Sequence, residues 1–561
     1  MKTTKNAIYL ILAFLLVSSC KEDVVKINPQ NEENENLIKL GKQLENPYTI
    51  ENMRKAYSNL TSGSNFRLAG DVITIEPNYK YVQFAPQDSV ELAQLENYDT
   101  ALILFDYPLD YEIENDSGDY YRDPLLPESV PTYQYTAVPI EYELPNIPHK
   151  ILSELFLPDE EIDEDYEIDT TITDARVLTK NDWLLALEDE ALAITGNLEE
   201  DVYTDDEENN NLRTLWGRRR RRRWNPSGRI RYFDDAINRF VPVHGVRVKA
   251  HRWFKMGYAY TNSDGVFWIG KRFRSNAKYN VKFKSREVNL VRGIWPNAVK
   301  IYGGNFKGQW NADFTNQHHT FYCQVHNAAK DYFFRWRPIY NIVRPSYAHI
   351  KVNPHKRGSN FGAHRYIAGA AVKVSRYNSN GGYRGSEGIY ATTIHELAHT
   401  AHYRMDNRFF IGLGSNVTDR KRRRFEKLLL KESYAEGIET ILTNRKYLEL
   451  TNRYGVGPGG ARFTGTEYND NSMQRENLAD MDEYTPLFVD LSDATNQQRT
   501  GLGRPLDRVS GYTLKQCQDA LDDADDLEDF INRLRTKFHN RTENRLDELL
   551  GQYNQVVDNN D

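Results

Sequence analysis

Two histidines four residues apart, with a glutamate between them, constrain the fold of this chain more than any other feature. The segment reads Thr393-Ile394-His395-Glu396-Leu397-Ala398-His399-Thr400. On a helix, residues four apart lie above one another on one face, so both imidazoles can reach a single ion while Glu396 projects beside them. The intervening and flanking residues are mostly apolar, which favours a helix packed in a core. The sequence therefore predicts a buried helix whose histidine pair binds a metal ion, because a buried pair with a glutamate between is hard to explain as core packing alone.

Zinc is the metal that this donor set favours. Two neutral imidazoles and one carboxylate suit zinc and leave a fourth position for water, which makes the predicted site catalytic in type. The carboxylate is expected from a helix at 419–448, whose apolar residues form a stripe with glutamates on or beside it. Glu432 and Glu436 are the candidates for the metal, whereas Glu439 is assigned to the solvent-exposed surface.

These two segments resemble the gluzincin group of zincin metallopeptidases. That group has His-Glu-x-x-His followed by a helix bearing Glu-x-x-Ala/Ser-Asp/Glu, and this chain has Glu432-Ser433-Tyr434-Ala435-Glu436. The resemblance implies that His395, His399 and Glu432 bind zinc and that Glu396 is the general base of peptide-bond hydrolysis. It also implies that Glu436 orients a ligand histidine from outside the ligand set. Glu436 stands where aspartate is commoner, so which of the two glutamates touches zinc stays open.

Further roles follow from the implied reaction. A tyrosine or histidine is expected to stabilise the oxyanion, and Tyr454, Tyr468 and Tyr484 are the candidates. A strand expected at 371–375, ahead of the metal helix, is predicted to pair with an extended peptide substrate as edge strands do. Two alternatives stay open: a surface binding protein whose zinc site is structural or vestigial, and an adhesion lipoprotein whose motif is accidental.

The first twenty residues predict export and lipidation. Two lysines precede an apolar run at 7–17 that is too short to span a bilayer. The stretch Val17-Ser18-Ser19-Cys20 resembles a bacterial lipobox, in which the cysteine is acylated, and Lys21-Glu22-Asp23 is similar to the export tag of surface lipoproteins in the Bacteroidota. The resemblance implies an outer-membrane lipoprotein at the cell surface, held to the membrane through its lipid and acting on extracellular protein or peptide.

Charge and cysteine content exclude other classes of function. The net charge of -8 combines acidic runs at 159–169 and 199–208 with a basic block at 218–223, a pattern typical of solvated linkers. The alternative for the basic block is a contact with an anionic glycan or a lipid phosphate. No nucleic-acid partner is expected for a surface protein. Only Cys323 and Cys517 follow Cys20, so zinc held by cysteines is excluded, and whether these two form a disulfide stays open.

The expected fold is multidomain: an α+β zincin-like catalytic domain, preceded by a small transthyretin-like β-sandwich and an N-terminal mixed α/β domain. Segments that alternate with period two, separated by turn residues, predict the antiparallel sandwich. Their order is similar to that of the carboxypeptidase-regulatory-like domain, which implies an accessory module. The expected divisions are a lipoprotein signal peptide at 1–20, a tether at 21–46, the N-terminal domain at 47–212, a basic linker at 213–227, the sandwich at 228–288, the zincin-like domain at 289–500 and a C-terminal helical extension at 501–561. Within the N-terminal domain, a helix is expected at 47–60 and strands at 81–84 and 101–105.

Overall fold

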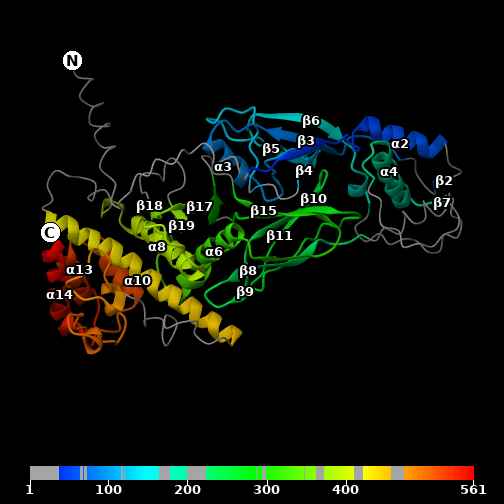
Figure 1. Ribbon diagram of the computed structural model, residues 1–561. Coiled ribbons are helices and arrows are strands. Elements are labelled where there is room, and N and C mark those ends of the chain that lie inside the picture. Colours follow the sequence, from blue (N-terminus) through cyan, green and yellow to red (C-terminus); the bar gives the residue numbers. More distant parts are fainter. Residues whose placement is uncertain are drawn as a thin grey trace, which may run out of the picture.

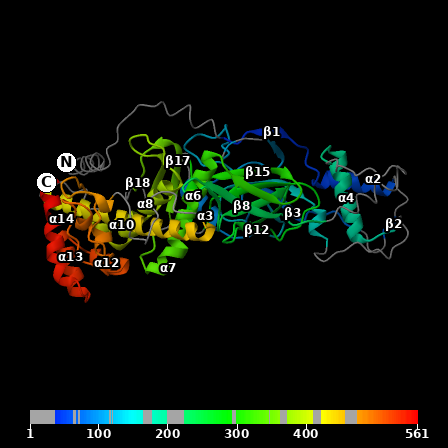
Figure 2. The same cartoon turned by 60° about the horizontal axis from the view of Figure 1, so that its bottom comes forward.

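The computed structural model describes residues 37–62, 67–68, 73–114, 118, 120–162, 177–198, 223–285, 287–292, 298–345, 348–361, 372–409, 421–455 and 473–560. Cys20, Tyr468, the acidic run 199–208 and most of the basic block lie outside these residues. The molecule is elongated, with the N-terminal domain at one end and the C-terminal helices at the other (Figure 1), an arrangement that persists in the turned view of Figure 2. No helix in the described part is long and apolar enough to cross a membrane.

The N-terminal domain is built on a three-stranded antiparallel sheet with β3 at its centre. Its elements are β1 (Leu40–Gln43), α2 (Ile50–Ser62), β2 (Arg67–Leu68), β3 (Tyr79–Phe84), α3 (Ser89–Asn97), β4 (Tyr111–Ile113), β5 (Gln134–Pro139), β6 (His149–Leu155), β7 (Val177–Leu178) and α4 (Lys180–Ile194). The predicted helix at 47–60 and strand at 81–84 are confirmed as α2 and β3.

Two expectations for this domain are wrong. No strand forms at 101–105, where Phe105 alone makes a bridge, to Tyr135. Part of the expected tether is ordered, because β1 pairs with β4 and Ile38 is buried in the core of this domain.

Two four-stranded sheets follow, and they pack face to face. Their strands are β8 (Ser227–Asp234), β9 (Arg239–Pro242), β10 (Arg247–Arg252), β11 (Lys255–Tyr260), β12 (Val266–Trp268), β13 (Ala277–Lys282), β15 (Lys300–Phe306) and β16 (Trp310–Phe314). One sheet has the order β11-β10-β13-β15; the other has β12-β8-β16, with β9 also paired to β8. The ring of Tyr279 on the first sheet lies 6.3 Å from that of Phe267 and 5.5 Å from that of Trp310 on the second, centroid to centroid.

The predicted sandwich is therefore present, but its expected end at residue 288 is wrong. β15 and β16 come after that boundary and complete the two sheets. The chain leaves the sandwich for β14 (Val288–Val291), which pairs with a different sheet, and then returns. All the pairings in the sandwich are antiparallel except that of β8 with β16.

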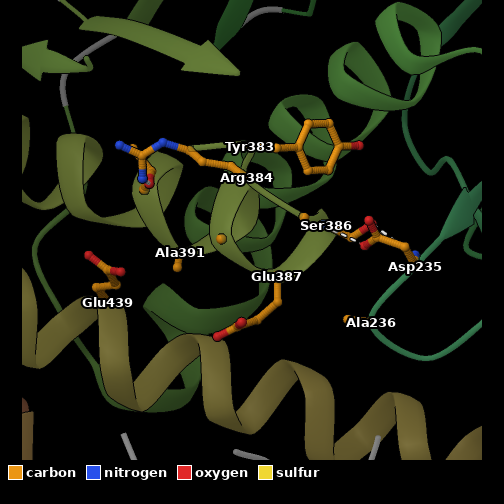
Figure 3. A pocket seen from close by; sticks show the side chains of 11 residues that line it. Asp235, Ala236, Tyr383, Arg384, Ser386, Glu387, Ala391 and Glu439 are labelled. Atoms are coloured by element: carbon orange, nitrogen blue, oxygen red, sulfur yellow. Dashed lines mark hydrogen bonds between the residues drawn. The ribbon is translucent and has the colours of Figure 1, made fainter. Parts of the chain in front are cut away.

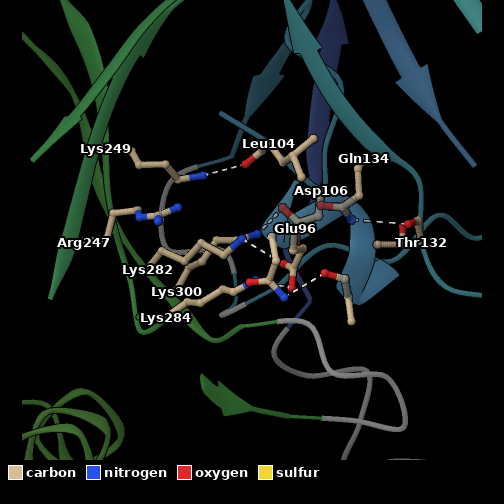
Figure 4. A network of polar contacts seen from close by, with 12 residues as sticks. Glu96, Leu104, Asp106, Thr132, Gln134, Arg247, Lys249, Lys282, Lys284 and Lys300 are labelled. Carbon is tan, nitrogen blue, oxygen red and sulfur yellow. Dashed lines mark hydrogen bonds and ion pairs between the residues drawn. The ribbon is translucent and has the colours of Figure 1, made fainter. Parts of the chain in front are cut away.

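Buried ion pairs fix the N-terminal domain on the sandwich (Figure 4). Glu96 on α3 lies 3.2 Å from Lys282 Nζ and 2.6 Å from Lys284 Nζ, and Asp106 pairs with Lys300. All five side chains are almost fully buried. Removing one partner of such a pair costs about 3–5 kcal/mol, since the remaining charge stays buried. The two domains therefore resist separation.

The domain that carries the histidine motif is a sheet covered by helices. The sheet has the order β14-β17-β19-β18, with the first three strands parallel and β18 antiparallel. Its further elements are β17 (Ala348–Arg357), β18 (Asn360–Phe361), β19 (Val372–Tyr377), α6 (Gln317–Asp331), a π-helical turn (Tyr332–Trp336), α7 (Arg337–Tyr340), α8 (Ser386–Met405) and α10 (Lys421–Tyr454). The strand expected at 371–375 is confirmed as β19, but its expected edge position is wrong, because β19 pairs with β17 on one side and, at Val372 and Lys373, with β18 on the other.

Short helices at the C-terminal end pack against α10. They are α11 (Leu487–Asp490), α12 (Leu514–Leu521), α13 (Leu527–Lys537) and α14 (Leu546–Asn560). One continuous hydrophobic core runs from the sandwich through α6, α8 and α10 to these helices. Cys323 and Cys517 are both buried in it and are not joined. The sandwich, the motif helices and the C-terminal helices thus share one packed interior.

Candidate metal centre

Three side chains from two helices converge on one point. His395 and His399 come from α8, and Glu432 comes from α10, which packs against it. Glu432 Oε2 lies 3.1 Å from His399 Nε2 and 3.4 Å from His395 Nε2, and the two Nε2 atoms are 3.1 Å apart. A tetrahedral zinc ion with bonds of about 2.0–2.1 Å holds its ligand atoms about 3.4 Å from one another. The three donors therefore fit a zinc ion.

The sequence of each helix explains why these donors face each other. Around the histidines α8 is buried on nearly every side, and Ile394, Leu397 and Ala398 are fully buried. α10 buries Leu429, Ala435 and many other residues along its middle turns against its neighbours. Polar side chains carried inward on such helices need partners, since an unpaired buried polar group is costly. The histidines and the glutamate meet that need in one another.

Metal binding needs neutral imidazoles and an ionised carboxylate, and the pKa shifts of His399 and Glu432 suit it. Burial acts to lower the pKa of His395, but Glu432 and Glu439 outweigh it and hold that pKa well above its usual range, so zinc has to displace a proton from this ring. Burial lowers the pKa of His399 to about 4, so this ring is neutral at physiological pH. Burial acts to raise the pKa of Glu432, but His399 and Lys431 outweigh it and hold that pKa well below its usual range. Lys431 Nζ lies 2.5 Å from Glu432 Oε1, which leaves Oε2 facing the histidines. Sequence reasoning missed Lys431.

A carboxylate on α10 also faces the outer nitrogen of His395, but it is not the expected one. Glu439 Oε2 lies 3.0 Å from His395 Nδ1, whereas Glu436 Oε2 lies 3.7 Å away. The structure thus places Glu439, which was assigned to the surface, in the orienting position expected of Glu436. A carboxylate on that nitrogen fixes the tautomer and the orientation of a ligand histidine. The spacing i, i+4, i+7 of Glu432, Glu436 and Glu439 was the available signal, because it puts all three on one helix face.

Glu396 lies beside the three donors without joining them. It is 5 % exposed, and its Oε2 is buried with no hydrogen-bond partner among the described residues. Burial raises the pKa of Glu396 to about 7, with the charges of Glu432 and Glu439 acting in the same direction and His395 opposing them. A carboxyl group with a pKa near neutrality both accepts and donates a proton readily.

Two of the three candidate tyrosines lie in the described part of the chain, and only one of them is near the site. The ring of Tyr484, in the segment before α11, lies 6.1 Å from the ring of His395. Tyr454 ends α10, twenty-two residues after Glu432, which is about 33 Å along the helix at 1.5 Å per residue. Tyr454 is therefore too far from the site, and Tyr468 lies outside the described residues.

A cavity of about 400 Å³ adjoins the centre (Figure 3). Glu439, on one wall, also faces His395. The other lining residues come from the turn after β8, the loop before α8 and the first turns of α8: Asp235, Ala236, Tyr383, Arg384, Gly385, Ser386, Glu387, Gly388, Ala391 and Thr392. Asp235 directly follows the end of β8 and lies far from α8 in the sequence.

Asp235 fixes the start of α8. Its Oδ1 accepts a hydrogen bond from Ser386 N at 2.7 Å, and its own N–H donates to Ser386 Oγ at 3.0 Å. Gln324 on α6 donates to the same hydroxyl at 2.6 Å. The first backbone N–H groups of a helix lack partners within the helix, so a carboxylate there is stabilising. A turn of the sandwich thus caps the helix that carries the histidines.

Comparison with models of known protein families found no match to this chain, and no curated protein matched it.

Proposed function

We propose that this chain is a zinc-dependent metallopeptidase that hydrolyses extracellular protein or peptide at a bacterial cell surface. The observation that carries the proposal is the convergence of His395, His399 and Glu432 at separations that fit a zinc ion. Three protein ligands leave a position for water and substrate, as catalytic zinc sites do, whereas structural sites are closed by four. The resemblance to gluzincins points in the same direction.

Zinc bound by these residues supplies Lewis-acid polarisation of a carbonyl and a water of lowered pKa. Glu396 is the proton carrier: it lies beside the donors on α8, and its pKa of about 7 allows it to take a proton from water and deliver it to the leaving amine. Glu439 Oε2 faces Nδ1 of His395 at 3.0 Å and is assigned to orient this ring. Of the two candidate tyrosines that the structure describes, Tyr484 is the one beside His395, and its hydroxyl is assigned to stabilise the developing oxyanion.

The location is proposed from the sequence. A lipid on Cys20 would anchor the protein in the outer membrane, with the catalytic domain outside the cell. Protein or peptide is then the available substrate class, and nucleic acid is not a partner.

The test compares wild type with Glu396→Gln in a peptide-library cleavage assay, with zinc measured on both samples. The variant should keep about one zinc per chain and lose turnover on the order of a hundredfold to ten-thousandfold, because only proton transfer is removed. Glu528→Gln, at an exposed position of α13, is the matched control and should change neither quantity.

Two results would contradict the proposal. Full zinc with undiminished, chelator-sensitive hydrolysis in Glu396→Gln would remove Glu396 from the mechanism. A wild-type protein that contains zinc but cleaves no peptide would favour a surface binding protein with a structural zinc site.

A further inference from the structure

Arg384 has a hydrogen-bonding capacity that its surroundings leave unfilled. It lies in the loop between β19 and α8 and lines the cavity beside the metal centre. Its Nη1 donates to Thr392 Oγ1 at 2.6 Å, while its Nε is buried without a hydrogen-bond partner among the described residues. A guanidinium has five N–H donors in one plane, so the contact with Thr392 uses only part of its capacity.

The guanidinium lies on the side of the cavity closest to the proposed chemistry. Thr392, which accepts its hydrogen bond, is one helical turn before Glu396 on α8. Burial lowers the pKa of Arg384, and the charges of Glu439 and Glu396 act in the opposite direction, which shows that both carboxylates are near. In Figure 3 the side chain extends away from Asp235, toward the side where Glu439 lies.

The acidic residues around the cavity already have tasks. Asp235 accepts a hydrogen bond from the first N–H of α8, and Glu439 lies 3.0 Å from Nδ1 of His395. Glu387 extends toward α10 in Figure 3, where its charge acts on Tyr447. The charged group that remains available to a ligand in this cavity is therefore the cation of Arg384.

A partly buried guanidinium favours a carboxylate above other ligands. The planar fork matches the two carboxylate oxygens, and such charge-assisted pairs are about twice as strong as neutral hydrogen bonds. Partial exclusion of water strengthens the attraction further. A peptide lying across the metal centre can offer a carboxylate at its C-terminus or on an aspartate or glutamate side chain.

We propose that Arg384 binds a carboxylate of the peptide substrate and thereby determines specificity for peptides that present a carboxylate to this cavity. The inference rests on the proposed function and names its substrate class. Lysine in place of Arg384 would keep the charge but lose the fork, so it should restore only part of the preference.

Binding, without turnover, is the measurement that tests this role. Calorimetry on zinc-loaded Glu396→Gln protein would use two pairs of probes: benzoyl-Gly-Phe against its C-terminal amide, and acetyl-Ala-Ala-Phe-Glu-Ala-amide against the matching glutamine peptide. The pair that shows a preference identifies the source of the carboxylate. We expect the acid of that pair to bind at least about tenfold tighter than its neutral counterpart, the scale of one charge-assisted pair.

Adding Arg384→Gln should abolish that preference while leaving the affinity for the neutral probes unchanged. Arg404→Gln, an exposed arginine in the last turn of the same helix, is the matched control and should keep the preference. Three results would overturn the inference. They are an equal loss of affinity for the acid and neutral probes in Arg384→Gln, a preference for the acid that survives this substitution, and no binding of any probe. Failure of the proposed function has a different signature, namely a zinc-loaded wild type that shows the Arg384-dependent preference and cleaves nothing.

Discussion

Replacing Asp235 with alanine should weaken zinc binding, although Asp235 belongs to the β-sandwich and touches none of the proposed ligands. The residue lies 151 positions before Ser386, and its Oδ1 accepts a hydrogen bond from Ser386 N at 2.7 Å. Ser386 begins α8, and the histidines lie on the same helix. Alanine removes the carboxylate acceptor but leaves the hydrogen bond from the N–H of residue 235 to Ser386 Oγ in place.

The size of the effect follows from the cap. Removing a side-chain cap costs about 0.5–2 kcal/mol, and a carboxylate at a helix N-terminus adds about 0.3–1 kcal/mol at an exposed site. Asp235 is itself exposed, so solvent screens its charge and we expect a loss of about 1–2 kcal/mol. If this whole free-energy loss is expressed in zinc binding, zinc affinity falls by about five- to thirtyfold, since 1.4 kcal/mol corresponds to a factor of ten. Asp235→Asn keeps an acceptor and should lose less than half as much.

The assay is zinc affinity by competition with a chromophoric chelator, together with urea unfolding of the same samples. Asp88→Ala is the matched control, because Asp88 caps α3 in the N-terminal domain by accepting from Val90 N at 2.8 Å and Glu91 N at 2.9 Å. That variant should lose similar stability with no change in zinc affinity. Wild-type zinc affinity in Asp235→Ala would refute the coupling between this cap and the zinc site. An equal drop in zinc affinity in Asp235→Ala and Asp88→Ala would refute it as well.

Three further predictions concern other parts of the chain. Glu432→Ala should abolish stoichiometric zinc in elemental analysis, whereas Glu439→Ala should weaken zinc binding about 10–100-fold, as loss of an orienting partner does; full zinc in Glu432→Ala with loss in Glu436→Ala would exchange the ligand roles. Burial raises the pKa of Asp493 from 3.8 to about 6, so the stability it gives is complete below pH 3.8 and is lost as pH rises through 6, a fall of about 3 kcal/mol in unfolding free energy. Asp493→Asn should flatten that fall in urea titrations between pH 4 and 8, and an unchanged slope would contradict it. Intact mass of membrane-extracted protein should show acylated Cys20, and acylation that persists in Cys20→Ala would exclude it.

The sequence predicted those parts of the fold whose patterns are local. The helices α8 and α10 follow from apolar periodicity, and the sandwich strands follow from alternation between turn residues. The end of the sandwich was missed because β14 interrupts it, pairing with β17 before β15 and β16 return to the sandwich sheets. No local signal distinguishes a strand that completes one sheet from a strand that begins another.

The same division holds for the candidate site. His395, His399 and Glu396 share one helical turn, so spacing alone brings them together. The choice between Glu436 and Glu439 depends on how α10 is rotated against α8, which tertiary packing decides. The sequence therefore limits the orienting group to one helix face but does not select the residue.

The sandwich contacts both helices of the candidate metal centre directly. Asp234, which ends β8, accepts a hydrogen bond from Tyr447 of α10 at 3.0 Å, and Asp235, the next residue, caps α8. One turn thus holds both helices that supply the proposed ligands. Because Glu432 must stay within about 3.4 Å of both histidines to share an ion with them, small shifts of α10 against α8 would open the site. Fixing both helices to the same two residues restricts that movement.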